Sequence, residues 1–249
     1  MTDQIEGRNP VLEALKAKTP INRIIIEKGE KRGSILEIIS MAKDLGIPIK
    51  ELDKKHLDKI SKTYNHQGII AETAEYKYSE IEDLLEKADK RREDALLVIL
   101  DGIEDPYNLG SIIRTSDAVG AHGIVIPKRR SASVTPLVIK SSAGAAAHVP
   151  VARETNLNRT VEMLKEKGLW IAGADMEGTS IYETDLKGPL ALVIGGEGKG
   201  ISRLLKEKCD FLVSIPMVGE ISSLNAATAA AIILYEIFRQ RSSKQGAVP

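Results

Sequence analysis

Five short apolar runs constrain the fold of this chain more than any other feature of its sequence. The first, at residues 96–100, is continuous, which is typical of a parallel strand covered on both faces. Further runs follow at 124–126, 170–172, 190–194 and 211–213, and helical patterns separate most of them. Strands that alternate with helices predict an α/β domain built on a parallel sheet.

The first 75 residues predict a second, smaller α/β unit. A helix is expected to begin near Asn9, which can cap it, and Pro10, which suits its first turn. Buried strands are expected at 23–26 and 69–71, with a helix between them that ends before Gly46.

Residues 76–95 have a different composition, rich in Glu, Asp, Lys and Arg with sparse apolar residues. This composition favours a linker that carries one exposed helix, and the surface of a domain is the alternative. The expected organisation is a small α/β domain at 1–75, a linker at 76–95, a parallel-sheet α/β domain at 96–241 and a flexible tail at 242–249.

The totals exclude several classes of protein. Lys+Arg and Asp+Glu are both 35, so no overall positive charge attracts nucleic acid, and the aromatic content of 4% is low for a protein that stacks bases on rings. Cys209 is the only cysteine, which excludes an intrachain disulfide and a thiolate metal cluster. No metal site is expected from the histidines either, since no two have ligand spacing: His56, His66, His122 and His148.

The N-terminus lacks the apolar core of a signal peptide, and no apolar run is long enough to cross a bilayer. We therefore expect a soluble cytoplasmic protein without a membrane partner.

Ligands of parallel α/β sheets bind in loops beyond the carboxyl ends of the strands, and three such loops are rich in glycine and polar residues. The first follows the strand at 96–100 and leads into a helix that contains Asn108, Gly110 and Arg114. Gly110 and Arg114 are four residues apart, so they share a helix face on which the glycine leaves room. The alternative makes Asn108 a plain helix cap and Arg114 a surface residue.

The second loop, residues 195–200, follows a buried strand and contains four glycines and Glu197. A dinucleotide fingerprint that starts at Gly196 would need a third glycine where Ile201 stands, and a P-loop would need Ser or Thr where Gly200 follows Lys199. Neither nucleotide motif is present. The remaining possibilities are a backbone that packs closely against a ligand and a flexible connector.

The third loop, residues 214–225, leads into an alanine-rich helix. Ser222 or Ser223 can cap this helix, and its first backbone N–H groups can also hold a polar ligand. An ordinary capped core helix is the alternative. Elsewhere, the basic run 128–130 is either a solvated loop or a contact for RNA phosphate.

Together the three loops resemble, in order and spacing, the motifs of the SpoU (TrmH) family of RNA ribose 2′-O-methyltransferases. The matching residues are Asn108, Gly110 and Arg114, then Ile194, Gly195, Glu197, Gly198 and Gly200, then Ile215, Pro216 and Met217 with Ser223, Leu224 and Asn225. Residues 7–11 and 66–68 also resemble the family's small N-terminal domain, which favours its RlmB branch, the guanosine 2′-O-methyltransferases of 23S rRNA. One departure is Ala226-Ala227-Thr228, where many relatives carry Val and Ser.

The resemblance implies an L30e-like substrate-binding domain followed by a SPOUT domain with a C-terminal trefoil knot. It implies S-adenosyl-L-methionine as the cofactor, ribosomal RNA as the substrate, and an obligate homodimer in which the partner completes each site. The residues expected to bind the cofactor are Gly195, Gly200, Ile215, Met217 and Leu224.

In the family the residue that matches Arg114 is thought to help activate the 2′-hydroxyl. Because arginine stays protonated, it is a poor base, and we favour contacts of Arg114 with the adjacent phosphate and the developing alkoxide. The residues expected to orient Arg114 and the ribose are Asn108, Glu197, Ser223 and Asn225. A tRNA methyltransferase of the same family, a non-catalytic RNA-binding factor and an NAD-linked enzyme are the alternatives.

Overall fold

The chain forms two compact units in the computed structural model, which describes residues 3–16, 20–29, 31–63, 65–73, 76–220 and 223–242. The N-terminal unit comprises Met1–Lys77 with Thr135–Lys140, and the C-terminal unit comprises Tyr78–Val134 with Ser141–Pro249. No helix within the described ranges is long and apolar enough to cross a membrane. The predicted tail lies almost entirely outside these ranges.

The N-terminal unit is built on a mixed sheet with the strand order β1-β4-β2-β3. Its strands are β1 (Asp3–Glu6), β2 (Ile21–Glu27), β3 (Ile49–Leu52) and β4 (Ile69–Thr73), and its helices are α1 (Arg8–Lys16), α2 (Ser34–Asp44) and α3 (Lys54–Ile60). Strand β4 is antiparallel to both β1 and β2, and β2 is parallel to β3. The small α/β unit expected from the sequence is therefore present. Its first helix begins at Arg8, one residue before the expected cap Asn9.

Helices cover both faces of this sheet. Because successive side chains of a strand point to opposite faces, neighbouring residues of β2 contact different helices. Ile24 and Ile26 of β2 pack with α1 and α2, whereas Ile25 packs with Leu57 of α3. The three consecutive isoleucines are thus all buried.

The C-terminal unit is built on a sheet of six parallel strands in the order β10-β8-β9-β5-β6-β7. The strands are β5 (Leu96–Asp101), β6 (Gly123–Pro127), β7 (Val151–Glu154), β8 (Trp170–Ser180), β9 (Leu190–Gly195) and β10 (Phe211–Ser214). The helices are α4 (Ile81–Arg91), α5 (Pro106–Ala118), α7 (Leu157–Glu166), α8 (Arg203–Glu207) and α9 (Ala226–Ser242), with the short helix η1 (Ala145–Ala147) before β7. The short helix α6 (Pro136–Ser141) also lies between β6 and β7 in the sequence, but all of it except Ser141 belongs to the N-terminal unit. The predicted parallel sheet is confirmed.

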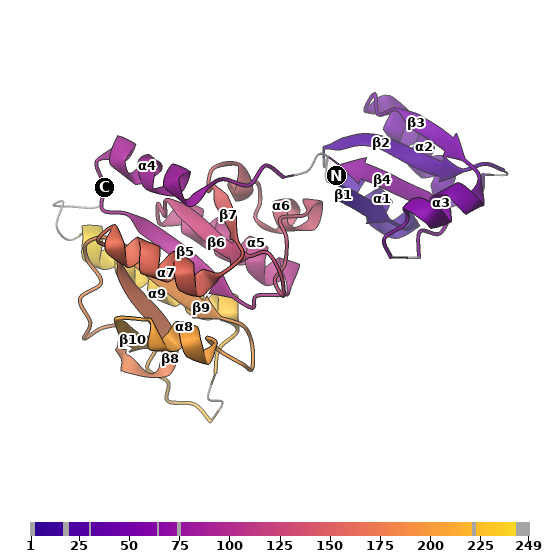
Figure 1. Ribbon diagram of the computed structural model, residues 1–249. Helices are drawn as coiled ribbons and strands as arrows, with labels where there is room; N and C mark the ends of the chain where they lie inside the picture. The colour runs from indigo at the N-terminus through magenta and orange to yellow at the C-terminus, as the bar shows by residue number, and fades with distance from the viewer. Residues whose placement is uncertain are drawn as a thin grey trace. The chain divides into compact units, whose positions relative to one another are not determined.

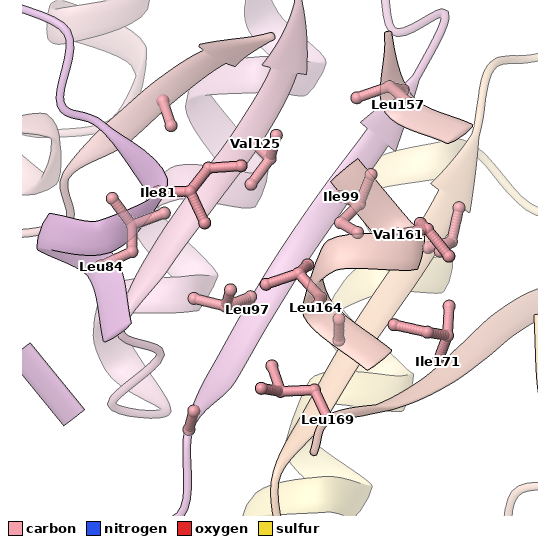
Figure 2. Packing of buried hydrophobic residues seen from close by; sticks show 14 of the residues in the cluster. Ile81, Leu84, Leu97, Ile99, Val125, Leu157, Val161, Leu164, Leu169 and Ile171 are labelled. Atoms are coloured by element: carbon pink, nitrogen blue, oxygen red, sulfur yellow. The ribbon is translucent and has the colours of Figure 1, made fainter. Parts of the chain in front are cut away.

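Helices lie on both faces of the parallel sheet, as Figure 1 shows. On one face, α4 and α7 pack on β5 and β6, where Leu84 and Leu164 join Leu97 and Ile99 in one buried cluster (Figure 2). On the other face, α5 and α9 pack against each other and against the strands. Both faces of β5 are therefore covered, which explains its uninterrupted apolar run.

The prediction that residues 76–95 carry an exposed helix is wrong. Ile81, Leu84 and Ala88 of α4 are buried in the cluster on the sheet, and only the opposite face of the helix is charged. A β-carbon at Gly123 would overlap with the Leu84 side chain, so β6 and α4 are in direct contact. The alternative reading, in which this segment belongs to the surface of a domain, describes the helix correctly.

Candidate active site

A cavity of about 650 Å³ opens at the carboxyl ends of β8, β9 and β10, the edge at which parallel sheets bind ligands. Its size suits a small-molecule cofactor. It is lined by all five residues that the sequence predicted as cofactor-binding: Gly195, Gly200, Ile215, Met217 and Leu224. The second and third of the three predicted loops therefore meet around a single cavity.

A polar cluster lies at this cavity and joins all three loops. The Asn108 side-chain amide donates to Glu197 Oε1 at 3.1 Å, and the Asn225 amide donates both to Asn108 Oδ1 at 2.9 Å and to Glu197. Glu197, Asn225 and the nearby Ser223 line the cavity, whereas Asn108 reaches the cluster from α5. Four of the five predicted catalytic residues are thus together, and we call Asn108, Glu197 and Asn225 the polar cluster.

The helix caps differ from those expected. Asp105 caps α5 by accepting from the N–H groups of Tyr107 at 3.3 Å and Asn108 at 3.2 Å, which frees the Asn108 side chain for the polar cluster. Asn225 caps α9 by accepting from the N–H groups of Ala227 at 2.9 Å and Thr228 at 3.1 Å. The expected caps were Ser222, which lies outside the described residues, and Ser223, which lines the cavity instead.

Arg114 lies apart from this assembly within its own chain. Its side chain is exposed on α5, does not line the cavity, and has no hydrogen bond or ion pair with any residue that the structure describes. The room expected beside Gly110 is occupied, since a β-carbon there would overlap with the Ser141 side chain. Gly110 therefore allows the end of α6, at Ser141, to pack on α5.

The glycine-rich loop folds tightly onto its own backbone. Gly200 N–H donates to the Gly196 carbonyl at 2.9 Å, and the Asp101 main chain and side chain accept from Gly196 N–H at 2.8 Å and from Ser202 N–H at 2.7 Å. A β-carbon at Gly195 would overlap with the main chain of Gly200 and Ile201. The sequence suggested a backbone that packs closely against a ligand, and at Gly195 the close packing in the structure is between parts of the loop itself.

The cavity also has a wall that the sequence analysis missed, formed by Ala174, Asp175 and Met176 of β8. β8 leaves its register with β10 here, because Leu212 pairs with Gly173 while the next residue, Val213, pairs with Thr179. Asp175 follows the predicted strand at 170–172, so a polar residue just after a buried strand was the available signal. We call residues 174–178 the β8 excursion.

Acidic groups dominate the charge around the cavity. Asp175 and Glu197 line it, and among the lining residues in the described ranges there is no lysine or arginine. Burial would raise the pKa of Asp175, but the hydrogen bond from Glu177 N–H and the Lys206 ammonium outweigh it and hold the pKa below its ordinary value. The cavity therefore suits a ligand that carries positive charge.

A basic loop follows β6 at the same edge of the sheet. Arg129 and Arg130 are exposed, and Arg153 Nη2 donates to the Lys128 carbonyl at 3.3 Å. The Arg153 guanidinium lies 4.7 Å from the centre of the Tyr78 ring, whose hydroxyl accepts from Val134 N–H at 2.9 Å. The loop is thus held to its own unit and leaves two arginines exposed.

Comparisons with known proteins match both units. Residues 95–235 match the model of the SpoU rRNA Methylase family, and residues 4–79 match the model of the RNA 2′-O ribose methyltransferase substrate-binding domain. The chain is 47% identical over 241 residues to the putative TrmH family tRNA/rRNA methyltransferase YacO of Bacillus subtilis (strain 168), with 96% of each chain covered. It is 48% identical over 241 residues to a putative TrmH family tRNA/rRNA methyltransferase of Staphylococcus aureus (strain COL), with 95% of this chain and 96% of the relative covered.

Solved structures are similar over almost the whole chain. The SpoU methyltransferase AviRb from Streptomyces viridochromogenes, in complex with the cofactor AdoMet, has a TM-score of 0.63 at 29% identity, covering 97% of this chain and 91% of that one. An AdoMet-bound rRNA methyltransferase from Sinorhizobium meliloti has a TM-score of 0.61 at 25% identity, covering 96% and 87%.

Proposed function

The chain belongs to the SpoU rRNA methylase family, and from this membership we propose that it methylates the ribose 2′-hydroxyl of a guanosine in 23S ribosomal RNA. The family transfers methyl groups to RNA from S-adenosylmethionine. The observation that carries the proposal is the polar cluster at the edge of the cavity, where side chains from three loops converge on one place. Such convergence is typical of a site that orients a substrate.

The residues around the cavity fit S-adenosylmethionine in size and charge. A cavity of about 650 Å³ is large enough for this cofactor, and the Glu197 carboxylate, which forms no ion pair with any described residue, complements a sulfonium. We assign the contacts to Gly195, Gly200, Ile215, Met217 and Leu224. When bound, the cofactor supplies an electrophilic methyl group, so the protein's task is to place the hydroxyl in line with it.

We assign the orientation of the ribose to Asn108, Glu197, Ser223 and Asn225. Glu197 accepts from both amides of the polar cluster, which fixes its carboxylate and leaves further acceptor sites for a hydroxyl. Arg114 is assigned to the adjacent phosphate and to the developing alkoxide, because its planar guanidinium can form two parallel hydrogen bonds.

The position of Arg114 outside its own chain's cavity supports the proposal of a homodimer with shared sites. α9 exposes an apolar face with Tyr235 and Phe238, whose rings pack edge to face at 6.2 Å, and Tyr107 on α5 is 60% exposed. Two copies that bury this face would bring Arg114 of one protomer to the cavity of its partner. Within each C-terminal unit, the trefoil knot is part of the same proposal.

The homodimer is tested by mixing two inactive variants. Arg114→Ala and Glu197→Ala chains, unfolded and refolded together, should recover about a quarter of the wild-type sites, because half of the dimers carry one intact combination. Recovery of no activity would place Arg114 and Glu197 in the same chain's site. An active monomer in sedimentation experiments would contradict the dimer itself.

A tRNA substrate is the second candidate, because the curated relatives are described as tRNA/rRNA methyltransferases. Purified protein should be incubated with S-adenosylmethionine and either 23S rRNA fragments or tRNA, followed by mapping of 2′-O-methyl nucleotides. Methylation of a guanosine in the rRNA alone supports the proposal. Methylation of tRNA alone selects the second candidate, and cofactor binding without transfer to either RNA favours a non-catalytic RNA-binding factor.

We assign RNA binding to the N-terminal unit and to the basic loop after β6. The N-terminal unit matches a substrate-binding model, and Arg129 and Arg130 are exposed at the sheet edge that carries the cavity. Exposed arginines contact phosphates without reading sequence, so they would position the RNA.

A further inference from the structure

The β8 excursion brings a carboxylate to the cavity beside the glycine-rich loop. Gly173 of β8 pairs with Val193 of β9, so Asp175 lies level with the end of β9, where Gly195 begins the loop. A β-carbon at Gly178 would overlap with the main chain between Leu212 and Val213, so the excursion rejoins the sheet by close packing on β10. The position of Asp175 is therefore set by backbone contacts at both ends of a short segment.

Lys206 of α8 holds the Asp175 carboxylate in place. Its ammonium lies 2.9 Å from Asp175 Oδ2 and 2.9 Å from a Glu177 oxygen, while Asp175 Oδ1 accepts from Glu177 N–H at 3.0 Å. Because each carboxylate oxygen can accept two hydrogen bonds, both oxygens of Asp175 keep one free acceptor position. The Asp175 side chain is only 18% exposed and lines the cavity.

From this geometry, and resting on the proposed function, we infer that Asp175 accepts hydrogen bonds from the ribose hydroxyls of the methyl donor and determines specificity for that sugar. Two free acceptor positions on a fixed carboxylate match two neighbouring hydroxyl donors. A carboxylate on the strand next to a glycine-rich loop holds ribose in the same way in dinucleotide-binding folds.

The charges around the cavity favour the hydroxyls over the donor's ammonium group as the partner of Asp175. Lys206 already supplies a positive charge to Asp175, which reduces its attraction for a second cation. Glu197 is bound only by neutral amides of the polar cluster among the described residues, so its charge is not compensated there. The positive groups of the donor are thus better matched at Glu197, and the neutral hydroxyls at Asp175.

Binding of two nucleosides to the full chain tests the inference. The probes are 5′-methylthioadenosine, which has the sugar and base but no amino acid, and its 2′-deoxy form. The wild-type protein should bind the deoxy form about tenfold more weakly, the effect of one lost hydrogen bond to a charged group. In Asp175→Asn this ratio should fall, because the neutral amide oxygen accepts a weaker hydrogen bond from the 2′-hydroxyl than the carboxylate does, so less is lost with deoxyribose.

Two further variants control this experiment. Asp185→Asn alters another carboxylate that accepts from the N–H two residues later, on the surface and away from the cavity, and should keep the wild-type ratio. Lys206→Met should lower the ratio in part, with recovery in Lys206→Arg, if the lysine positions Asp175. Each ratio compares the affinities of one variant for the two nucleosides. A loss of folded protein lowers both apparent affinities equally and therefore does not change the ratio.

Three results would overturn the inference. A ratio of nucleoside affinities in Asp175→Asn equal to that of the wild type would show that the Asp175 carboxylate does not bind the ribose. If Asp175→Asn weakens binding of S-adenosylhomocysteine but not of methylthioadenosine, Asp175 binds the amino group of the donor and not its ribose. Wild-type protein that binds neither the nucleosides nor S-adenosylmethionine would also overturn the proposed function, whereas binding with unchanged ratios overturns this inference alone.

Discussion

Glycine has different roles in the two units. In the N-terminal unit, Gly33 and Gly46 have positive φ angles of 61° and 67°, and a β-carbon on either would meet only open space. In the C-terminal unit, Gly195 and Gly178 stand where a β-carbon would overlap with neighbouring main chain. Glycines that only turn the chain occur in both units, such as Gly188 in the second. Among the described glycines, those that let two backbones touch lie in the C-terminal unit, and the cavity lies beside Gly195, where the glycine-rich loop touches itself.

The largest expected effect is that of a β-carbon at the glycine-rich loop. Gly195→Ala should abolish binding of S-adenosylmethionine in calorimetry. The added β-carbon forces Gly200 and Ile201 to move, and the loop that lines the cavity moves with them. The control Gly46→Ala adds the same atom where there is space and should cost only about 1 kcal/mol of stability, the strain of a left-handed alanine. Wild-type affinity in Gly195→Ala would show that the contrast between the units is wrong.

Removing the N-terminal unit should separate RNA recognition from cofactor binding. A chain that starts at Tyr76 should bind S-adenosylmethionine with near wild-type affinity but lose methylation of rRNA fragments. Full activity of this truncated chain would contradict the assignment of substrate binding to the first unit.

The starting residue of the truncation matters, because α4 belongs to the C-terminal core. A chain that starts at Leu96 would expose the sites of Ile81 and Leu84, each worth about 1.5–3 kcal/mol of burial. Its urea midpoint, followed by the fluorescence of the single tryptophan, Trp170, should be clearly lower than that of the chain from Tyr76. Equal urea midpoints would show that α4 does not stabilise the C-terminal unit and would support the linker predicted from the sequence.

A smaller effect is expected at Arg114, which distinguishes electrostatic help from base catalysis in the C-terminal unit. Arg114→Lys should lower the transfer rate by about 10²–10³, by analogy with a lost oxyanion donor, at unchanged cofactor affinity. The measurement is a single-turnover pH–rate profile. A steep rise to near wild-type rates above about pH 9 would favour a base, because lysine loses its proton far more readily than arginine.

The smallest expected effect is on the pH dependence of stability. Both units contain a buried histidine whose ring lies between a backbone amide and a carboxylate. His66 accepts from Gly68 N–H at 3.1 Å and contacts Asp58 at 2.8 Å, and His122 accepts from Leu96 N–H at 2.9 Å and contacts Glu93 at 3.0 Å. Burial lowers the pKa of His122 below its ordinary value of 6.5, although the Glu93 carboxylate raises it.

Because its pKa is lower in the folded state, His122 contributes stability that is present above pH 6.5 and is lost as the pH falls through the folded value. Urea unfolding followed by Trp170 should therefore show a C-terminal unit that weakens on acidification. His122→Gln should reduce this slope, whereas His56→Gln, at an exposed site of the N-terminal unit, should leave it unchanged. A slope that is identical in all three proteins would contradict the role of His122.

Most of the strands that the sequence predicted have residues buried on both faces, with β10 as an exception. Ile24–Ile26 and the run at 96–100 are apolar at every position, because helices cover both sides of their sheets. β7 was missed because only Val151 and Ala152 are buried in it, and β1 and β3 were missed because they are short, with partly or fully exposed side chains at 4–6 and 49–52. These three strands lie at sheet edges, where the apolar pattern is weak, whereas the edge strand β10 was predicted because its residues 211–213 are all apolar.

The site was predictable where it depends on local motifs and unpredictable where it depends on packing. Gly195 and Asn225 were found from loop composition and from the resemblance. Asp175 was missed because its place at the cavity results from a register shift between β8 and β10, which no local pattern encodes. Gly110 was assigned to the right helix for the wrong reason, since its partner Ser141 is 31 residues away and comes close only in the fold.

The overlap of backbones at Gly195 also limits how the enzyme could be re-engineered for donors with bulkier transferable groups. Enlarging a pocket normally means trimming a side chain, and glycine has none to trim. Space can be gained at lining positions that carry a side chain, such as Met176 and Leu224, which are 69% and 37% exposed, or Ile215. A library for an altered alkyl donor should therefore vary these three positions and keep the glycines fixed.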